Sequence, residues 1–232
     1  MSARAKRNRR PRTSLKVLFI GNSFTARNDL PGLVASLASG AGLELRHRLI
    51  SVGGASLRTH WNKGEAQRAI STGKYDYIVL QEQSTLPVKN AERMHDNVRL
   101  FDRCIAATGA RTALYMTWAR QREPQNQKLI TGAYTSIAEE LGATLLPAGA
   151  AWQAFMAKHK SPVLHDKDGS HPTLAGSFLA ACVMFVVLFK RRAEGLKVAV
   201  KGLSEDELLA LERCADEVVG RGKDHPLKRA AR

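Results

Sequence analysis

The sequence has few cysteines and no cysteine pair of the C-x-x-C type. Its 232 residues contain three, Cys104, Cys182 and Cys214, which are far apart and lie in apolar segments of helical character. An odd number of widely separated cysteines argues against a disulfide scaffold. We therefore expect buried free thiols and a reducing compartment, the cytoplasm.

Long hydrophobic runs and nucleotide-binding glycine motifs are also missing. The most apolar uncharged run, residues 174–189, has 16 residues and contains Gly176 and Ser177, whereas a membrane span needs about 20 residues. The apolar run 15–20 after the basic start is shorter than the roughly 7 to 15 residues of a signal peptide core. Neither G-x-x-x-x-G-K-[ST] nor G-x-G-x-x-G occurs. We expect a buried core helix over 174–189, no targeting segment and no nucleotide cofactor.

Acidic residues are outnumbered, because 36 Lys and Arg face 21 Asp and Glu, a net charge of +15. Most of the excess lies at the ends: residues 1–12 hold six basic and no acidic side chains, and residues 221–232 hold five basic and one acidic. We predict one domain over residues 14–220, a basic disordered extension over 1–13 and a basic tail over 221–232. Such ends attract polyanions weakly and without sequence preference, although solvated termini are the simpler interpretation.

The remaining composition, 44% hydrophobic and 25% charged, suits a single folded domain. Short apolar runs alternate with stretches of helical periodicity, which predicts a three-layer α/β/α fold with a five-stranded, mostly parallel sheet. The expected strands are 16–20, 45–52, 75–80, 112–117 and 143–146. The expected helices are 30–39, 65–71, 91–108, 125–141, 150–158, 172–190 and 204–219, with Pro31 and Pro172 in first turns.

In such a sheet, ligands bind beyond the carboxyl ends of the strands. Ser23 follows the first predicted strand, two residues after Gly21, where its hydroxyl would be exposed. A turn-forming serine is the ordinary explanation of this position. The G-x-S-x-G motif of α/β-hydrolases is absent because residue 25 is Thr.

A serine nucleophile needs a base, and a histidine base needs a carboxylate that fixes its tautomer. Asp168 precedes His171 by three residues in a predicted turn, which would let the carboxylate reach the imidazole. A surface Asp and His in a loop is the alternative. A metal site built from His165, Asp166, Asp168 and His171 is a second alternative, since these side chains suit hard and borderline cations.

Taken together, Gly21-Asn22-Ser23-Phe24, Gly54 and Asp168-Gly169-Ser170-His171-Pro172 resemble the SGNH (GDSL-like) hydrolase superfamily, over roughly residues 15–192. The resemblance implies a flavodoxin-like α/β/α fold and hydrolysis of esters without a metal or organic cofactor. It also implies that Ser23 is the nucleophile, His171 the general base and Asp168 its orienting partner. The backbone N–H groups of Ser23 and Gly54 would then stabilise the oxyanion.

The sequence departs from the family at two positions. Asn22 replaces the usual Asp of the first motif, a change we expect to matter little. The third motif lacks its Asn, because Gln81-Glu82-Gln83-Ser84 stands there. We assign the side-chain amide of the oxyanion hole to Gln83, with Ser84 and Thr85 as alternatives.

Three residues at the strand ends are candidate substrate contacts, Asn22, Glu82 and Trp118. Glu82 would position a substrate hydroxyl or pair with a nearby Arg, and Trp118 would stack on a substrate or act as a structural plug. The predicted function is a serine esterase or deacylase that acts on a small ester through an acyl-enzyme. The rivals are a metal-dependent hydrolase and a catalytically weak binding protein for a small ligand or an anionic polymer.

Overall fold

The structure is a computed structural model that describes residues 13–220. The predicted basic extension, apart from Thr13, and the predicted basic tail therefore lie outside the described residues. Five strands form one sheet with the order β2-β1-β3-β4-β5, and all neighbouring pairs are parallel. The strands are β1 (Ser14–Gly21), β2 (Glu44–Ser51), β3 (Tyr77–Leu80), β4 (Arg111–Tyr115) and β5 (Thr144–Leu146).

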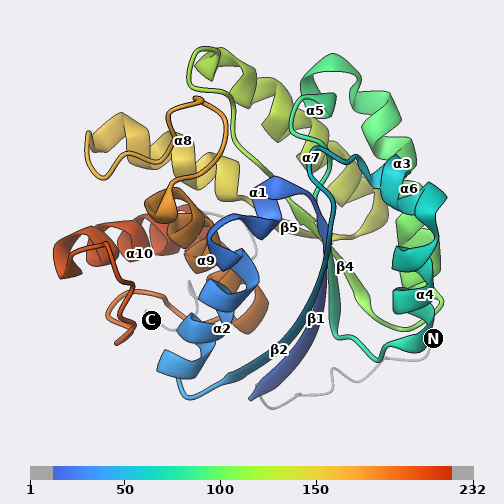
Figure 1. Ribbon diagram of the computed structural model, residues 1–232, viewed down its shortest axis with the longest axis horizontal. Helices are drawn as coiled ribbons and strands as arrows, with labels where there is room; N and C mark the ends of the chain where they lie inside the picture. The colour runs from blue at the N-terminus through green and yellow to red at the C-terminus, as the bar shows by residue number, and fades with distance from the viewer. Residues whose placement is uncertain (1–12, 221–232) are drawn as a thin grey trace, which may run out of the picture.

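Helices cover both faces of this sheet (Figure 1). The α-helices are α1 (Ser23–Ala26), α2 (Leu30–Gly40), α3 (Leu57–Lys63), α4 (Glu65–Thr72), α5 (Leu86–Lys89), α6 (Ala91–Ala106), α7 (Gln127–Leu141), α8 (Ala148–Lys158), α9 (Leu174–Phe189) and α10 (Glu205–Gly220), with short 3-10 turns at Arg27–Asp29 and Pro124–Asn126. The three-layer α/β/α prediction is confirmed. Sequence periodicity missed α1, α3 and α5, because one or two turns contain too few residues to show a period.

The two faces of the sheet build two separate hydrophobic cores. Side chains alternate along a strand, so Val17 and Phe19 of β1 point to one face, and Leu18 and Ile20 point to the other. The first core is completed by α2, α8, α9 and α10, and the second by α3, α4, α6 and α7. Both faces are thus dry, which explains why the central strands are continuous apolar runs.

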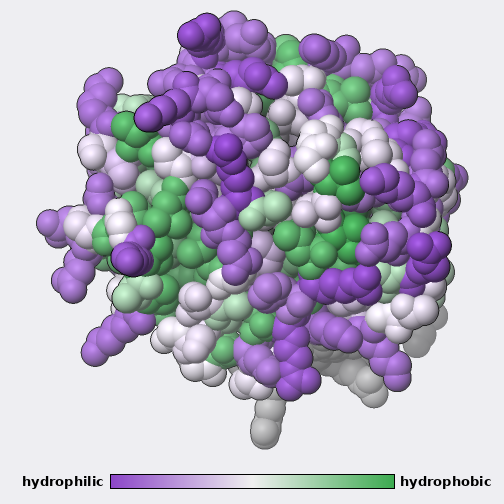
Figure 2. Space-filling model, viewed as in Figure 1, coloured by the Kyte–Doolittle hydropathy of each residue, from purple (hydrophilic) through white to green (hydrophobic). Residues whose placement is uncertain are grey.

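The apolar run 174–189 is a core helix, as predicted. In α9, 14 of the 16 residues are buried. None of the helices within residues 13–220 is long and apolar enough to cross a membrane. On the face shown in Figure 2, hydrophilic residues cover most of the surface, and hydrophobic residues appear between them as separate patches.

The helix starts differ from the prediction by one or two residues at α7, α8, α9 and α10, and the start of α9 has a clear physical reason. Thr173 caps α9 through its side chain, which accepts a hydrogen bond from the Gly176 N–H, so the helix begins at Leu174. Pro172 therefore precedes the helix and pairs with His165 in an isolated antiparallel bridge. A threonine hydroxyl can satisfy a helix N–H, whereas proline only tolerates the position.

Candidate active site

Ser23 is held at the carboxyl end of β1 by a tight turn. Asn22 is the N-cap of α1, and its side-chain oxygen accepts the Phe24 N–H at 3.0 Å. A Cβ atom on Gly21 would lie 2.6 Å from Oε1 of Gln81, so a larger residue there would displace that amide. The turn places Ser23 at the first position of α1, at the carboxyl ends of the strands.

A chain of hydrogen bonds links Ser23 to His171 and Asp168. Ser23 Oγ lies 2.8 Å from His171 Nε2, and His171 Nδ1 lies 2.5 Å from Asp168 Oδ2. The other carboxylate oxygen accepts the backbone N–H groups of Ser170 and His171, each at 2.9 Å. The bond from the imidazole, followed by these two backbone bonds, holds the pKa of Asp168 well below its usual range. An ionised carboxylate can only accept, so Nδ1 carries the proton and Nε2 is free to accept one from Ser23.

The loop that carries His171 is fixed by its own turn and by a tryptophan. Gly169 has a φ of +66°, a conformation that favours glycine, and its N–H bonds the Asp166 carbonyl at 2.8 Å. The indole N–H of Trp118 donates to the Ser170 carbonyl at 3.0 Å. The imidazole is therefore attached to a backbone with few remaining degrees of freedom.

Buried aromatic rings lie beneath this loop. The Phe24 ring is 5.2 Å from the His171 ring and 5.2 Å from the Trp118 ring. Trp118 stacks on Trp152 with centroids 3.5 Å apart and an interplanar angle of 4°. Trp118 is only 2% exposed, so it lies under the site and not in contact with solvent. Of the two roles expected for Trp118, burial fits the structural plug and leaves no ring face for a substrate.

The backbone N–H groups of Ser23 and Gly54 donate no hydrogen bond to any residue within 13–220. Gly54 has a φ of +65°, and no atom lies within 4 Å of where its Cβ would be, so the space beside it is open. The Asn22 amide donates to the Ala55 carbonyl at 2.9 Å and ties this turn to the start of α1. Asn22, which we expected to matter little, therefore connects the two loops while it is itself buried.

Gln81, which the sequence marked only as one of the polar residues after β3, supports the Ser23 turn. Its Oε1 accepts the Asn22 N–H and the Thr25 hydroxyl, both at 2.9 Å, and its side chain is fully buried. His60 of α3 supports the same turn from another side, with Nε2 2.7 Å from the Gly21 carbonyl. Burial lowers the pKa of His60. A strand-end position was the only sequence signal for Gln81, and His60 had none beyond its place after the glycine loop.

Glu82 is enclosed by protein and is not exposed at the candidate site. Its carboxylate is fully buried and accepts hydrogen bonds from Leu57 N, Gln83 N and Asn97 Nδ2. Burial raises the pKa of Glu82, against the effect of these donors. Both expected roles, a substrate contact and an Arg pair, are corrected: the carboxylate joins the start of α3 to the loop after β3, and the neighbouring Arg58 bonds Asn97 instead.

Gln83 is half-buried and uses only its oxygen within the protein. Oε1 accepts the Thr85 N–H, the Thr85 hydroxyl and the Leu86 N–H at the start of α5. Within the described part of the chain, its amide N–H₂ group has no hydrogen-bond partner. The Thr85 hydroxyl is bonded to Gln83, which leaves the Gln83 amide as the free side-chain donor of this pair.

The alternative metal site is not assembled. His165 points to the Ala119 carbonyl at 3.0 Å, and burial lowers the pKa of this histidine. Asp166 forms an exposed ion pair with Arg27 at 2.5 Å. No group of three or more His, Cys, Asp or Glu side chains within residues 13–220 is arranged to hold a metal ion.

No family model matches the chain, and no curated protein matches it. Solved structures do. A candidate SGNH hydrolase from Slackia heliotrinireducens is 27% identical with a TM-score of 0.65, covering 75% of this chain and 99% of that one. A DUF4886 family protein from Bacteroides uniformis is 20% identical with a TM-score of 0.74 and covers 93% and 99%. Axe2, an acetylxylan esterase from Geobacillus stearothermophilus, is 17% identical with a TM-score of 0.58 and covers 77% and 96%.

Proposed function

We propose that this chain, which has the fold of the SGNH hydrolases and whose structural neighbours support membership in that superfamily, hydrolyses carboxylic esters with Ser23 as nucleophile. The observation that carries the proposal is the 2.8 Å contact between Ser23 Oγ and His171 Nε2, backed by Asp168 on the other ring nitrogen. A serine hydroxyl becomes a competent nucleophile only when such a base can take its proton.

In the first half of the reaction, Ser23 Oγ attacks the ester carbonyl carbon while its proton moves to His171 Nε2. The tetrahedral intermediate expels the alcohol, which receives that proton from His171, and an acyl-serine remains. Water then attacks the acyl-serine with His171 again as base, releases the carboxylic acid and restores the hydroxyl. Asp168 stays ionised throughout and stabilises the imidazolium, a role that its low pKa supports.

The negative charge on the carbonyl oxygen would be met by three donors: the backbone N–H groups of Ser23 and Gly54 and the amide of Gln83. The free state of all three donors supports this assignment. Donors that are already in place when charge develops are worth about 3 to 4 kcal/mol each. Asn22, Glu82 and Trp118 then act as positioning residues that hold these groups from beneath.

Labelling by a fluorophosphonate probe, followed by mass mapping of the labelled peptide, tests the proposal. We expect one label on Ser23, and we expect it to be lost in Ser23→Ala and in His171→Ala. Hydrolysis of p-nitrophenyl acetate should fall in kcat by at least about 10⁴-fold in both variants. Ser36→Ala and His47→Ala remove an exposed serine and an exposed histidine away from the site and should keep labelling and turnover.

Labelling of a different serine, or normal turnover in either Ser23→Ala or His171→Ala, would overturn the assignment. Circular dichroism and thermal unfolding of each variant separate loss of chemistry from loss of fold. Asp168→Asn is a third test variant. It keeps the shape of the side chain, but its amide can donate a hydrogen bond to Nδ1 and so favour the wrong tautomer of the imidazole. We expect kcat to fall by about 10⁴-fold.

A further inference from the structure

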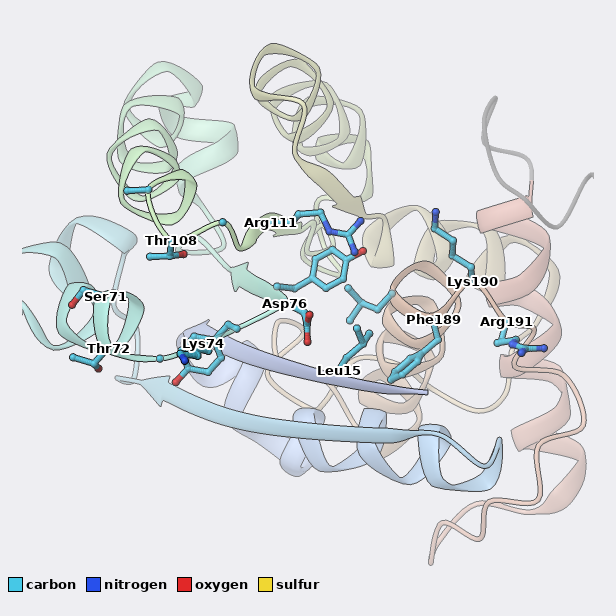
Figure 3. A pocket seen from close by; sticks show the side chains of 16 residues that line it. Leu15, Ser71, Thr72, Lys74, Asp76, Thr108, Arg111, Phe189, Lys190 and Arg191 are labelled. Atoms are coloured by element: carbon cyan, nitrogen blue, oxygen red, sulfur yellow. The ribbon is translucent and has the colours of Figure 1, made fainter. Parts of the chain in front are cut away.

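A cleft of about 1010 Å³ (Figure 3) lies at the amino ends of the strands, whereas Ser23 follows the carboxyl end of β1. It is bordered by the amino ends of β1, β3 and β4 and by the carboxyl ends of α4, α6 and α9. Because all five strands are parallel, the residues that precede the strands and the residues that follow them lie at opposite ends of the sheet along the strand direction. The cleft is therefore separate from the candidate active site.

The cleft is lined by four basic side chains, Lys74, Arg111, Lys190 and Arg191, and by one acidic side chain, Asp76. All four basic residues are exposed. None of them forms a salt bridge with a carboxylate in the described part of the chain. The Asp76 carboxylate accepts the Lys16 backbone N–H at 2.8 Å. An excess of cations without carboxylate partners distinguishes this cleft from an ordinary surface of mixed charge.

The partial negative charges of the helix ends neutralise only part of this positive charge. Each helix carboxyl terminus carries about half a negative elementary charge and attracts cations. Three such ends, those of α4, α6 and α9, offset about half of the excess positive charge of the lining. The remaining positive charge can attract an anion from solution.

Arg111 is prepared to bind an oxyanion. Its guanidinium lies over the Tyr77 ring, with Cζ 4.0 Å from the ring centroid, which restricts the motion of the group. The N–H groups of the guanidinium form no hydrogen bond within residues 13–220. A guanidinium stacked on an aromatic ring with a free N–H edge suits the bidentate binding of phosphate oxygens.

The shape of the cleft also bears on the ligand. A cleft that is concave and basic matches an extended polyanion better than a flat membrane surface.

We infer that this cleft binds the phosphodiester backbone of single-stranded nucleic acid, as a site independent of ester hydrolysis. Fluorescence anisotropy of a labelled mixed-sequence 20-nucleotide strand, titrated with the full chain at several salt concentrations, tests the inference. The cleft variant is K74Q/K190Q/R191Q. Its charge-matched control is R93Q/K128Q/K201Q, which removes three exposed basic side chains that do not line the cleft. Arg111→Gln is measured separately because its ring contact also has a packing role.

Each phosphate contact contributes about 0.7 to the slope of log affinity against log salt for a single strand. We expect the cleft variant to lose about 2 from this slope and at least about tenfold in affinity at 0.1 M salt. The control should retain both, and p-nitrophenyl acetate hydrolysis should be unchanged in both variants. Equal losses in the two variants would overturn the site and assign binding to net charge. Absence of binding by the wild-type chain at low salt, or binding to anionic vesicles but not to the strand, would also overturn it.

Discussion

Replacing Asn22 by Asp tests whether the amide between the two loops is required. In the wild-type protein the side chain accepts from Phe24 N at 3.0 Å and donates to the Ala55 carbonyl at 2.9 Å, and it is only 2% exposed. Asn22→Asp keeps the acceptor and removes the donor. The ionised carboxylate would then face a carbonyl oxygen in a buried place.

Two opposing effects set the size of the loss. A buried carbonyl left without its donor costs about 1 to 3 kcal/mol, and the buried charge beside it adds to this. A negative charge at the start of a helix stabilises the protein by about 0.3 to 1 kcal/mol. Because α1 has only four residues, we expect the lower end of this range. We expect Asn22→Asp to lower the free energy of unfolding by about 2 to 3 kcal/mol at pH 8.

The loss should shrink on acidification. Burial and the facing carbonyl raise the pKa of the introduced carboxyl above its unfolded value. Between the two values the folded state binds more protons than the unfolded state, so stability falls as pH rises and recovers as pH falls. Once protonated, the carboxyl can also donate its O–H to Ala55.

Urea unfolding at pH 5 and pH 8 measures the difference between variant and wild type at each pH. Asn22→Ala removes both hydrogen bonds without adding a charge, so its loss should be the same at the two pH values. The reasoning is refuted if Asn22→Asp matches the wild-type stability at pH 8, or if its deficit does not depend on pH.

Three further outcomes are expected. Trp118→Phe removes the hydrogen bond to Ser170, so kcat should fall about 10-fold to 100-fold with KM unchanged, an orphaned carbonyl costing about 1 to 3 kcal/mol; Trp61→Phe is the control, and an equal kcat loss there would contradict the role. Gln83→Glu keeps the oxygen that caps α5 but removes the amide donor, so kcat should fall by about 10²-fold or more, and unchanged turnover would exclude Gln83 from the oxyanion hole. His60 has a lowered pKa in the folded state, so its share of stability is present above the unfolded pKa and is lost as pH falls below it; urea unfolding at pH 7 and pH 5 should show a smaller loss for His60→Gln than for the wild type, and an identical loss would refute this.

The fold class could be predicted from the sequence because its signals are local. Both faces of a parallel sheet are buried, so its central strands are apolar runs that need no partner to be identified. The alternation of these runs with helical periodicity then implies the layers. The order of the strands, with β1 between β2 and β3, is not encoded in any local pattern of apolar residues.

The proximity of Ser23 to His171, 148 residues later, was expected from strand ends and a short motif, and the structure brings the two side chains within hydrogen-bond distance. The turn from Asp168 to His171 is encoded within four residues, since its hydrogen bonds join near neighbours. Local geometry of this kind can be read along the chain. Catalysis by these residues remains a prediction.

The sequence by itself determined the layers, the strand ends and the two loops that meet there. Only the tertiary structure decided which polar side chains at those ends face solvent and which support the site from below, as Glu82, Trp118 and Gln81 do. Their hydrogen-bond partners lie up to 59 residues away in the chain. Burial and partners at that separation depend on how helices and loops pack over the sheet, and no local pattern of residue types carries that information.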